Sequence, residues 1–266
     1  MHFAVLRLRP STPPAAGMIP PAAAALAVSA LGALVLVACV PEGPATTGAG
    51  STAKPAVTAA PVRPKTAPSG PLITAPFEDA FDRVELGPDY NALGPAWKLQ
   101  NGKLCARGAR NKGIWLNRRL PVNARIEFDA YAESPDGDLK AELWGDGVSG
   151  ATGTSYTNAT SYLTILGGWK NTKHVLARLD EHGDDRLEID IDKTADDERQ
   201  RAVSPGQVYH FKVERSDAKT VSWSVNNVTY FDFADPEPLT GAGHEHVGFN
   251  DWDAPVCFDN LKIVPL

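Results

Sequence analysis

The chain has 266 residues, of which 26 are basic and 32 are acidic, and its composition changes at Phe77. Five of the basic residues and one of the acidic residues precede Phe77, so the remainder carries 21 basic and 31 acidic residues and a formal net charge of −10. Such a surface repels nucleic acid and anionic lipid, which argues against nucleic-acid binding, and it permits cations and neutral ligands such as sugars.

The first 38 residues have the pattern of a secretory signal. Arg7 and Arg9 precede an apolar run over residues 22–38, which is marginal for spanning a hydrocarbon core about 30 Å thick. The run ends in Leu36-Val37-Ala38-Cys39, which has the form of a bacterial lipobox: small residues fit a peptidase site, and the cysteine thiol takes the lipid. We expect cleavage before a lipidated Cys39. An uncleaved membrane helix that ends in cysteine is the alternative.

The sequence that follows indicates the cellular location of the protein and a flexible tether. Val40 comes after the cysteine, and by resemblance to lipoprotein sorting in diderm bacteria a residue other than Asp there favours the outer membrane. We therefore expect a protein of the cell envelope that is anchored in the membrane only through its lipid. Residues 39–76 are rich in Pro, Ala, Thr and Gly, so they bury too little apolar surface to order. Residues 77–266 hold all six Trp and all six Tyr and are expected to form one domain.

This domain shows the alternation of β-strands. Ile126, Phe128 and Ala130 share one face of a run with period two, and Asn226-Asn227 predicts a tight hairpin turn. No 12-residue window shows the apolar stripe of a helix. About a dozen such runs predict an all-β antiparallel sandwich. The main predicted strands are 113–120, 125–130, 139–144, 162–169, 175–180, 187–192, 209–214, 221–225, 228–231, 247–250 and 256–264.

Two cysteines lie within the domain, Cys105 and Cys257. If Cys39 carries lipid, these two can pair, and a disulfide suits an oxidising compartment. The bond would close a loop of about 150 residues and would be worth up to about 5 kcal/mol in the chain-entropy model. It requires an early strand to lie beside the last one. Two buried free thiols are the alternative.

Several short motifs occur in a fixed order along the domain. It opens with Phe77-Glu78-Asp79-Ala80-Phe81 and Trp97-Lys98-Leu99, and it closes with Val247-Gly248-Phe249-Asn250-Asp251-Trp252 and Phe258-Asp259-Asn260-Leu261-Lys262-Ile263. As an ordered set they resemble the concanavalin A-like lectin/glucanase superfamily, in particular its bacterial laminin-G-like jelly rolls. The resemblance implies that the first and last strands are neighbours, which would bring the two domain cysteines within bridging range. The superfamily includes lectins, glycosidases, carbohydrate-binding modules and adhesive domains, so it does not settle function.

One set of polar and aromatic residues has the composition of a sugar site. An aromatic ring contacts the apolar face of a sugar, and planar polar groups bind its hydroxyls. Arg178 and Asp180 are expected to share a strand face because they flank Leu179. Core or rim packing of the two tryptophans and a surface ion pair are the alternative. The candidate ligand-binding residues are Trp169, Asn171, Arg178, Asp180, Asn250 and Trp252.

A second set could be catalytic. Glu188-Ile189-Asp190-Ile191-Asp192 looks like the Glu-x-Asp-x-Glu strand of jelly-roll glucanases, and alternation places its three carboxylates on one face. The last residue is Asp, whose shorter side chain would retract the proton donor. On a flat strand, residues four apart are separated by about 13 Å, so Glu188 and Asp192 would converge only on a curved strand. A solvated acidic face is the alternative.

Metal binding has weaker support in the sequence. His244 and His246 could share an ion, although structural zinc uses more ligands and no free cysteine is near. Calcium held by loop carbonyls and Asp136, Asp138 or Asp253 is a further option, because related jelly rolls often use it. We assign no metal site and no cofactor.

Three functional hypotheses follow. The sequence favours a lipid-anchored, lectin-like envelope protein that binds glycan without catalysis. The first alternative is a glycoside hydrolase that uses Glu188 and Asp192. The second is an adhesive or structural envelope lipoprotein whose partner is a protein.

Overall fold

The computed structural model describes residues 70–266, which belong to one compact unit. The predicted signal peptide, Cys39 and residues 40–69 of the tether lie outside the described residues. The tether is expected to continue to residue 76, but the structure shows ordered packing before that residue. Ile73 is buried in the core, and its N–H donates to the carbonyl of Arg119 at 2.9 Å. Packing therefore begins a few residues before Phe77.

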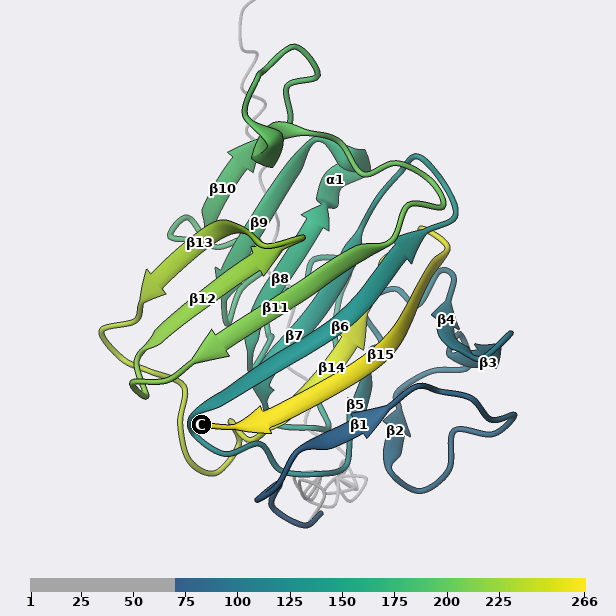
Figure 1. Cartoon of the computed structure of the whole chain (residues 1–266), viewed down its shortest axis with the longest axis vertical. Coiled ribbons are helices and arrows are strands. Elements are labelled where there is room, and N and C mark those ends of the chain that lie inside the picture. Colours follow the sequence, from purple (N-terminus) through teal and green to yellow (C-terminus); the bar gives the residue numbers. More distant parts are fainter. Residues whose placement is uncertain (1–69) are drawn as a thin grey trace, which may run out of the picture. The chain divides into compact units, whose positions relative to one another are not determined.

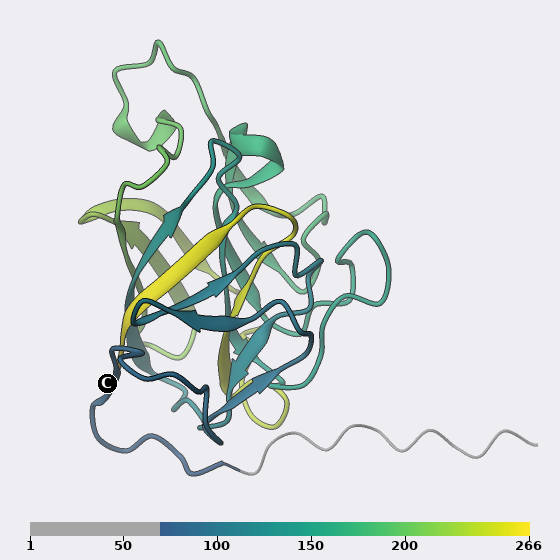
Figure 2. The same cartoon turned by 90° about the vertical axis from the view of Figure 1, so that its right-hand side faces the viewer.

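Two antiparallel sheets stacked face to face form the domain (Figures 1 and 2). The first sheet has the order β13-β12-β11-β6-β15-β4-β3, with β1 paired to β15, and the second has the order β10-β9-β8-β7-β14-β5-β2. The first sheet comprises β1 (Phe77–Asp79), β3 (Lys98–Gln100), β4 (Lys103–Ala106), β6 (Ala124–Ala132), β11 (Tyr209–Arg215), β12 (Thr220–Val225), β13 (Val228–Ala234) and β15 (Val256–Pro265). The second comprises β2 (Tyr90–Ala92), β5 (Ile114–Leu116), β7 (Leu139–Gly145), β8 (Tyr162–Gly167), β9 (Lys173–Arg178), β10 (Leu187–Asp190) and β14 (His246–Asn250). The all-β antiparallel sandwich predicted from the sequence is confirmed.

The first sheet follows the rule of one buried and one solvated face. Along β6, every second residue from Ala124 to Ala132 is buried, and the residues between them are partly exposed. Strand β11 alternates in the same way, so that Phe211 stacks on Phe128 with ring centroids 4.8 Å apart. Alternation of this kind is what the sequence pattern predicts for a sheet packed on one side. The turn at Asn226 and Asn227 has positive φ at both residues and joins β12 to β13, as predicted.

The second sheet is covered on both faces. All seven residues of β7 and all six of β8 are buried. Leu163 and Ile165 of β8 face away from the main core and pack with Tyr156 in a second, smaller apolar cluster. Tyr156 belongs to the segment 146–161 between β7 and β8, which therefore lies over the outer face of this sheet. Polar residues of β7 that alternate with the core positions are consequently buried as well.

The expected disulfide is present. Cys105 of β4 is bonded to Cys257 of β15, and the two residues are directly paired in register. Strand β1 also pairs with β15, so the beginning and the end of the domain are neighbours, as the resemblance implied. The only helices in the described part of the chain are α1 (Gly168–Asn171) and the short η1 (Glu198–Gln200). Within residues 70–266, no helix is long and apolar enough to span a membrane.

Replacing both cysteines with alanine (C105A/C257A) is expected to lower the free energy of unfolding by about 2–5 kcal/mol. The bond closes a loop over a separation of 152 residues, so its loss frees much of the unfolded chain. Urea denaturation of the full chain, followed by tryptophan fluorescence, measures this change. Reduced wild type serves as the control and should match the variant. Equal stability of the variant and the oxidised wild type would contradict a stabilising role.

Candidate functional site

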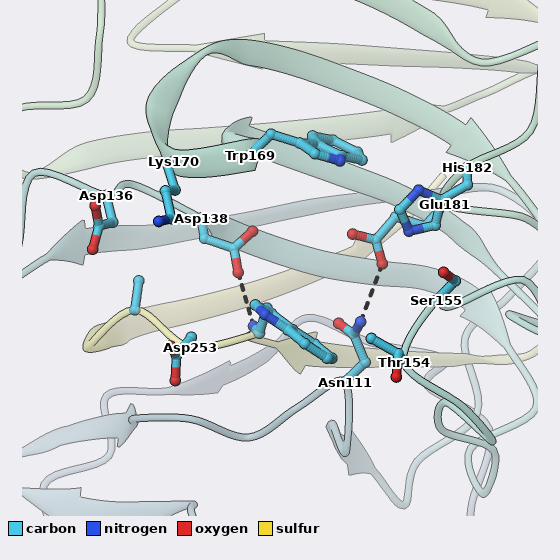
Figure 3. Close-up of a pocket in the computed structure, with 12 residues that line it drawn as sticks. Asn111, Asp136, Asp138, Thr154, Ser155, Trp169, Lys170, Glu181, His182 and Asp253 are labelled. Carbon is cyan, nitrogen blue, oxygen red and sulfur yellow. Dashed lines mark hydrogen bonds between the residues drawn. The ribbon is translucent and has the colours of Figure 1, made fainter. Parts of the chain in front are cut away.

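A pocket of about 340 Å³ opens at one end of the second sheet (Figure 3). It lies where the loop before β7, the segment 146–161, α1, the turn after β9 and the β14–β15 loop come together. Two of its residues, Trp169 and Trp252, come from the predicted sugar site. The lining residues are Asn111, Asp136, Asp138, Thr154, Ser155, Trp169, Lys170, Glu181, His182, Trp252, Asp253 and Ala254.

The turn that carries Trp169 has an unusual backbone. Element α1 is not a right-handed helix, because Trp169, Lys170 and Asn171 have φ values of 51°, 59° and 61°. Each residue other than glycine costs about 1–2 kcal/mol in this left-handed region. Such strain persists where the surroundings fix the backbone, and it concentrates at functional sites.

Two side chains hold this turn in place. Oδ1 of Asn171 accepts the N–H of Val203 at 2.9 Å, and its Nδ2 donates to the carbonyl of the same residue at 2.7 Å. The N–H of Gly167 donates to Nδ1 of His174 at 2.9 Å. Burial lowers the pKa of His174 to about 4, so its imidazole is neutral and can accept this bond. Trp169 is thereby held half-buried at the pocket, and Figure 3 shows its ring above the carboxylates of Asp138 and Glu181.

Trp252, in the loop between β14 and β15, is held by hydrogen bonds of its backbone N–H and carbonyl. Its N–H donates to Oδ2 of Asp138 at 2.8 Å, and its carbonyl accepts the N–H of Arg110 at 2.9 Å. The guanidinium of Arg110 lies 4.7 Å from the indole centroid, within the range of a cation–π contact. In the same way, the guanidinium of Arg186 lies 4.8 Å from the Trp169 indole. Each indole thus has an arginine guanidinium within cation–π range.

A buried lysine lies beneath the pocket. Lys140 of β7 is fully buried, and its ammonium donates to Oδ1 of Asn111 at 2.9 Å and to Oε1 of Glu181 at 3.0 Å. Asp138 completes the group, with Oδ1 at 3.8 Å from Nζ. Burial alone would lower the pKa of Lys140, but the neighbouring carboxylates outweigh it and raise this pKa, so the lysine is charged. Residues far apart in the sequence therefore meet at one ammonium.

Asn250, which the sequence placed in the sugar site, lies in a second polar group behind the pocket. It is fully buried, and its Nδ2 donates to Oε1 of Glu142 at 2.6 Å. The hydroxyls of Tyr156 and Ser161 donate to the other oxygen of Glu142, each at 2.8 Å. Burial raises the pKa of Glu142 to about 7, although these donors counteract the shift. Asn250 supports the second sheet and does not line the pocket.

The remaining residues of the predicted sugar site also lie outside the pocket. Asn171 holds the left-handed turn. Strand β9 ends at Arg178, and Leu179 has a φ of 63°, so the expected alternation stops there and Arg178 and Asp180 do not share a strand face. Nε of Arg178 donates to Oδ2 of Asp235 at 2.8 Å. Asp180 accepts the N–H of His182 in a turn.

The three candidate catalytic carboxylates are not gathered at the pocket. Glu188 and Asp190 lie on the edge strand β10, which ends at Asp190. Glu188 forms ion pairs with Lys173 at 2.5 Å and with Arg186. Slight burial raises its pKa, but the hydrogen bonds from these two cations outweigh it and lower the pKa overall. Asp192 lies beyond the strand, where its Oδ1 accepts hydrogen bonds from Thr194.

The residues considered for metals fall in two places. Asp136, Asp138 and Asp253 all line the pocket. His244 precedes β14, and its Nδ1 lies 2.8 Å from the carbonyl of Thr160, whereas His246 contacts the carbonyl of Leu116. Within residues 70–266, no three His, Cys, Asp or Glu side chains are arranged to hold a metal ion.

Several functional candidates were not assigned from the sequence. Glu181, His182 and Lys170 are sequence neighbours of predicted site residues, and that proximity is the only signal they carry. Asn111, Thr154 and Ser155 have no local signal, because they belong to loops that reach the pocket only through the fold.

Comparison with known proteins gives similarity in fold only. The sequence matches no protein-family model and no curated protein. A carbohydrate-binding module from Bacillus subtilis aligns with a TM-score of 0.47 and 15% identity, over 65% of this chain and 94% of that one. The alginate lyase Aly36B aligns with a TM-score of 0.48 and 11% identity, over 72% and 97%. The carbohydrate recognition domain of Emp47p aligns with a TM-score of 0.48 and 12% identity, over 72% and 95%. Each of these three TM-scores is below 0.5, and the sandwich is established by the strand pairing of this chain.

Replacing Lys140 with methionine is expected to lower the free energy of unfolding by about 3–5 kcal/mol, because the carboxylates of Glu181 and Asp138 would stay buried without their cation. Lys170→Met at the exposed rim is the matched control and should change stability by no more than about 0.5 kcal/mol. Urea denaturation at pH 7 measures both variants. If Lys140→Met were as stable as the control, the buried ammonium would not hold this end of the domain together.

Proposed function

We propose that the domain binds glycan in the pocket bordered by Trp169 and Trp252. The observation that carries this proposal is the strained left-handed turn that holds Trp169 at the rim. The free-energy cost of this left-handed backbone is several times RT, and hydrogen bonds of Asn171 and His174 hold the turn in place. A volume of about 340 Å³ is in the range of small-molecule sites. Two indoles with nearby carboxylates and an amide are the groups that sugar recognition uses.

The proposal is for binding without catalysis. A glycosidase needs two converging carboxyl groups, one of them a general acid with a raised pKa. The ion pairs that lower the pKa of Glu188, and the position of Asp192 beyond the end of β10, favour a binding role over hydrolysis at these residues. A protein partner, the other alternative from the sequence, has no specific observation in its favour.

We further propose that the domain is displayed in the cell envelope through a lipid on Cys39, in the outer membrane if the organism is diderm. The lipobox sequence supports this proposal. It agrees with the disulfide between Cys105 and Cys257, which needs an oxidising compartment and leaves Cys39 as the remaining cysteine of the chain.

Replacing both pocket tryptophans with alanine (W169A/W252A) is expected to weaken glycan binding by at least about 30-fold, or about 2 kcal/mol, because the rings supply the apolar contact. Calorimetric titration of the full chain with ligands selected on a glycan array measures this loss. Tyr131→Ala is the control, since Tyr131 is a partly exposed aromatic residue of β6 in the other sheet. A folded double variant that binds as tightly as wild type would refute the site.

Mass spectrometry of the protein purified from bacterial membranes tests the anchor. The mature chain is expected to begin at a Cys39 that carries acyl chains, and Cys39→Ala should move the protein out of the detergent phase. Cys105→Ala, which leaves the lipobox intact, is the control and should stay in the detergent phase. An intact N-terminus with an unmodified Cys39 would refute lipidation.

A further inference from the structure

The charged groups that line the pocket are mostly acidic. Four carboxyl groups line it, and the only cationic candidates among the lining residues are Lys170 and His182, both at the exposed rim. Among residues 70–266, neither of these two side chains forms an ion pair with a lining carboxylate. The carboxyl groups belong to Asp136, Asp138, Glu181 and Asp253.

One oxygen of the pocket floor accepts no hydrogen bond from residues 70–266. Asp138 is only 9% exposed, and its Oδ2 accepts the N–H of Trp252. Within the described residues no group donates a hydrogen bond to its Oδ1, and the Lys140 ammonium lies 3.8 Å away. Figure 3 shows the carboxylates of Asp138 and Glu181 pointing toward each other across the floor, below Trp169. A carboxylate offers about four acceptor positions, and Glu181 uses two of them.

Lys140 is the buried cation nearest to several carboxyl groups. Besides Asp138 and Glu181, its charge acts on Asp251, which is fully buried. Oδ2 of Asp251 accepts the N–H of Ala109 at 3.0 Å, and Oδ1 has no partner among residues 70–266. One ammonium thus has three carboxyl groups near it, and burial raises the pKa of Asp138 and raises that of Asp251 to about 7. A second cation beside Asp138 would favour the charged form of its carboxyl group.

We propose that the pocket selects an amino sugar, a glycan unit with a free amino group, and binds its ammonium between Asp138 and Glu181 beneath Trp169. An ammonium has three donors, which match the open acceptors of the two carboxylates. It also gains a cation–π contact with an indole within about 6 Å. N-acetylation removes the charge, and a uronate carboxylate would be repelled. The inference rests on the proposed function and adds the ligand class.

Calorimetric titration of the full chain at pH 6 with three tetrasaccharides tests this inference. The probes are a fully deacetylated β-1,4-glucosamine tetramer, its fully N-acetylated counterpart and a tetragalacturonate. The glucosamine tetramer is expected to bind at least 10-fold more tightly than the N-acetylated one, and the uronate is expected not to bind. Tetralysine has the same number of side-chain amines and should bind at least 10-fold more weakly than the glucosamine tetramer.

The outcomes separate this inference from the proposed function. Equal or tighter binding of the N-acetylated tetramer that is lost in W169A/W252A would overturn the inference and leave glycan binding intact. Tetralysine binding as tightly as the glucosamine tetramer would show that charge alone acts, and would also overturn it. Absence of binding to every probe and to a neutral glycan array would overturn both.

A substitution at Asp138 tests where the amino group of the ligand binds. Asp138→Asn is expected to weaken binding of the glucosamine tetramer at least 10-fold while changing binding of the N-acetylated tetramer by less than about 2-fold. Asp196→Asn, at an exposed carboxylate outside the pocket, should leave both unchanged. An unchanged preference in folded Asp138→Asn would overturn the placement. The comparison of ligands on wild type decides the inference even if that variant fails to fold.

Discussion

The buried ammonium of Lys140 is the interaction on which this end of the domain depends. It joins strand β7 to Asn111 before β5 and to Glu181 after β9, so segments separated by up to 70 residues meet at one atom. An uncompensated charge in this position would cost several kcal/mol, and the chain tolerates it because amide and carboxylate oxygens surround it. These partners also form the floor of the pocket. Stability and recognition therefore use the same residues.

The sandwich explains how two distant tryptophans come to border one pocket. Trp169 follows β8 and Trp252 follows β14, and both strands belong to the second sheet on either side of β7. Their loops leave the sheet at the end where the pocket opens. The outer face of this sheet is closed by the segment 146–161 instead of being solvated, and the pocket opens at the edge of the sheet.

Much of the fold could be predicted from the sequence, because strand alternation is a local pattern. The runs at β6, β11 and β12 alternate as expected, and Asn226-Asn227 forms the expected turn. Strand β7 shows a limit of this pattern. Polar residues that alternate with core residues usually face solvent, yet Lys140 and Glu142 are both buried, because the segment 146–161 covers this face of the sheet. Coverage of this kind depends on tertiary packing and leaves no local signal.

The site could be predicted only in part for the same reason. Trp169 and Trp252 were recognisable by residue type, whereas Arg178 and Asp180 were placed together on the assumption that a strand continues through Leu179, whose positive φ ends it. Two-dimensional NMR of the six indole N–H groups during titration with the glucosamine tetramer tests the central claim most directly. The account predicts that the resonances of Trp169 and Trp252 shift while those of the buried Trp115, Trp144 and Trp223 stay in place. Shifts confined to other tryptophans, or none while the ligand binds, would contradict it.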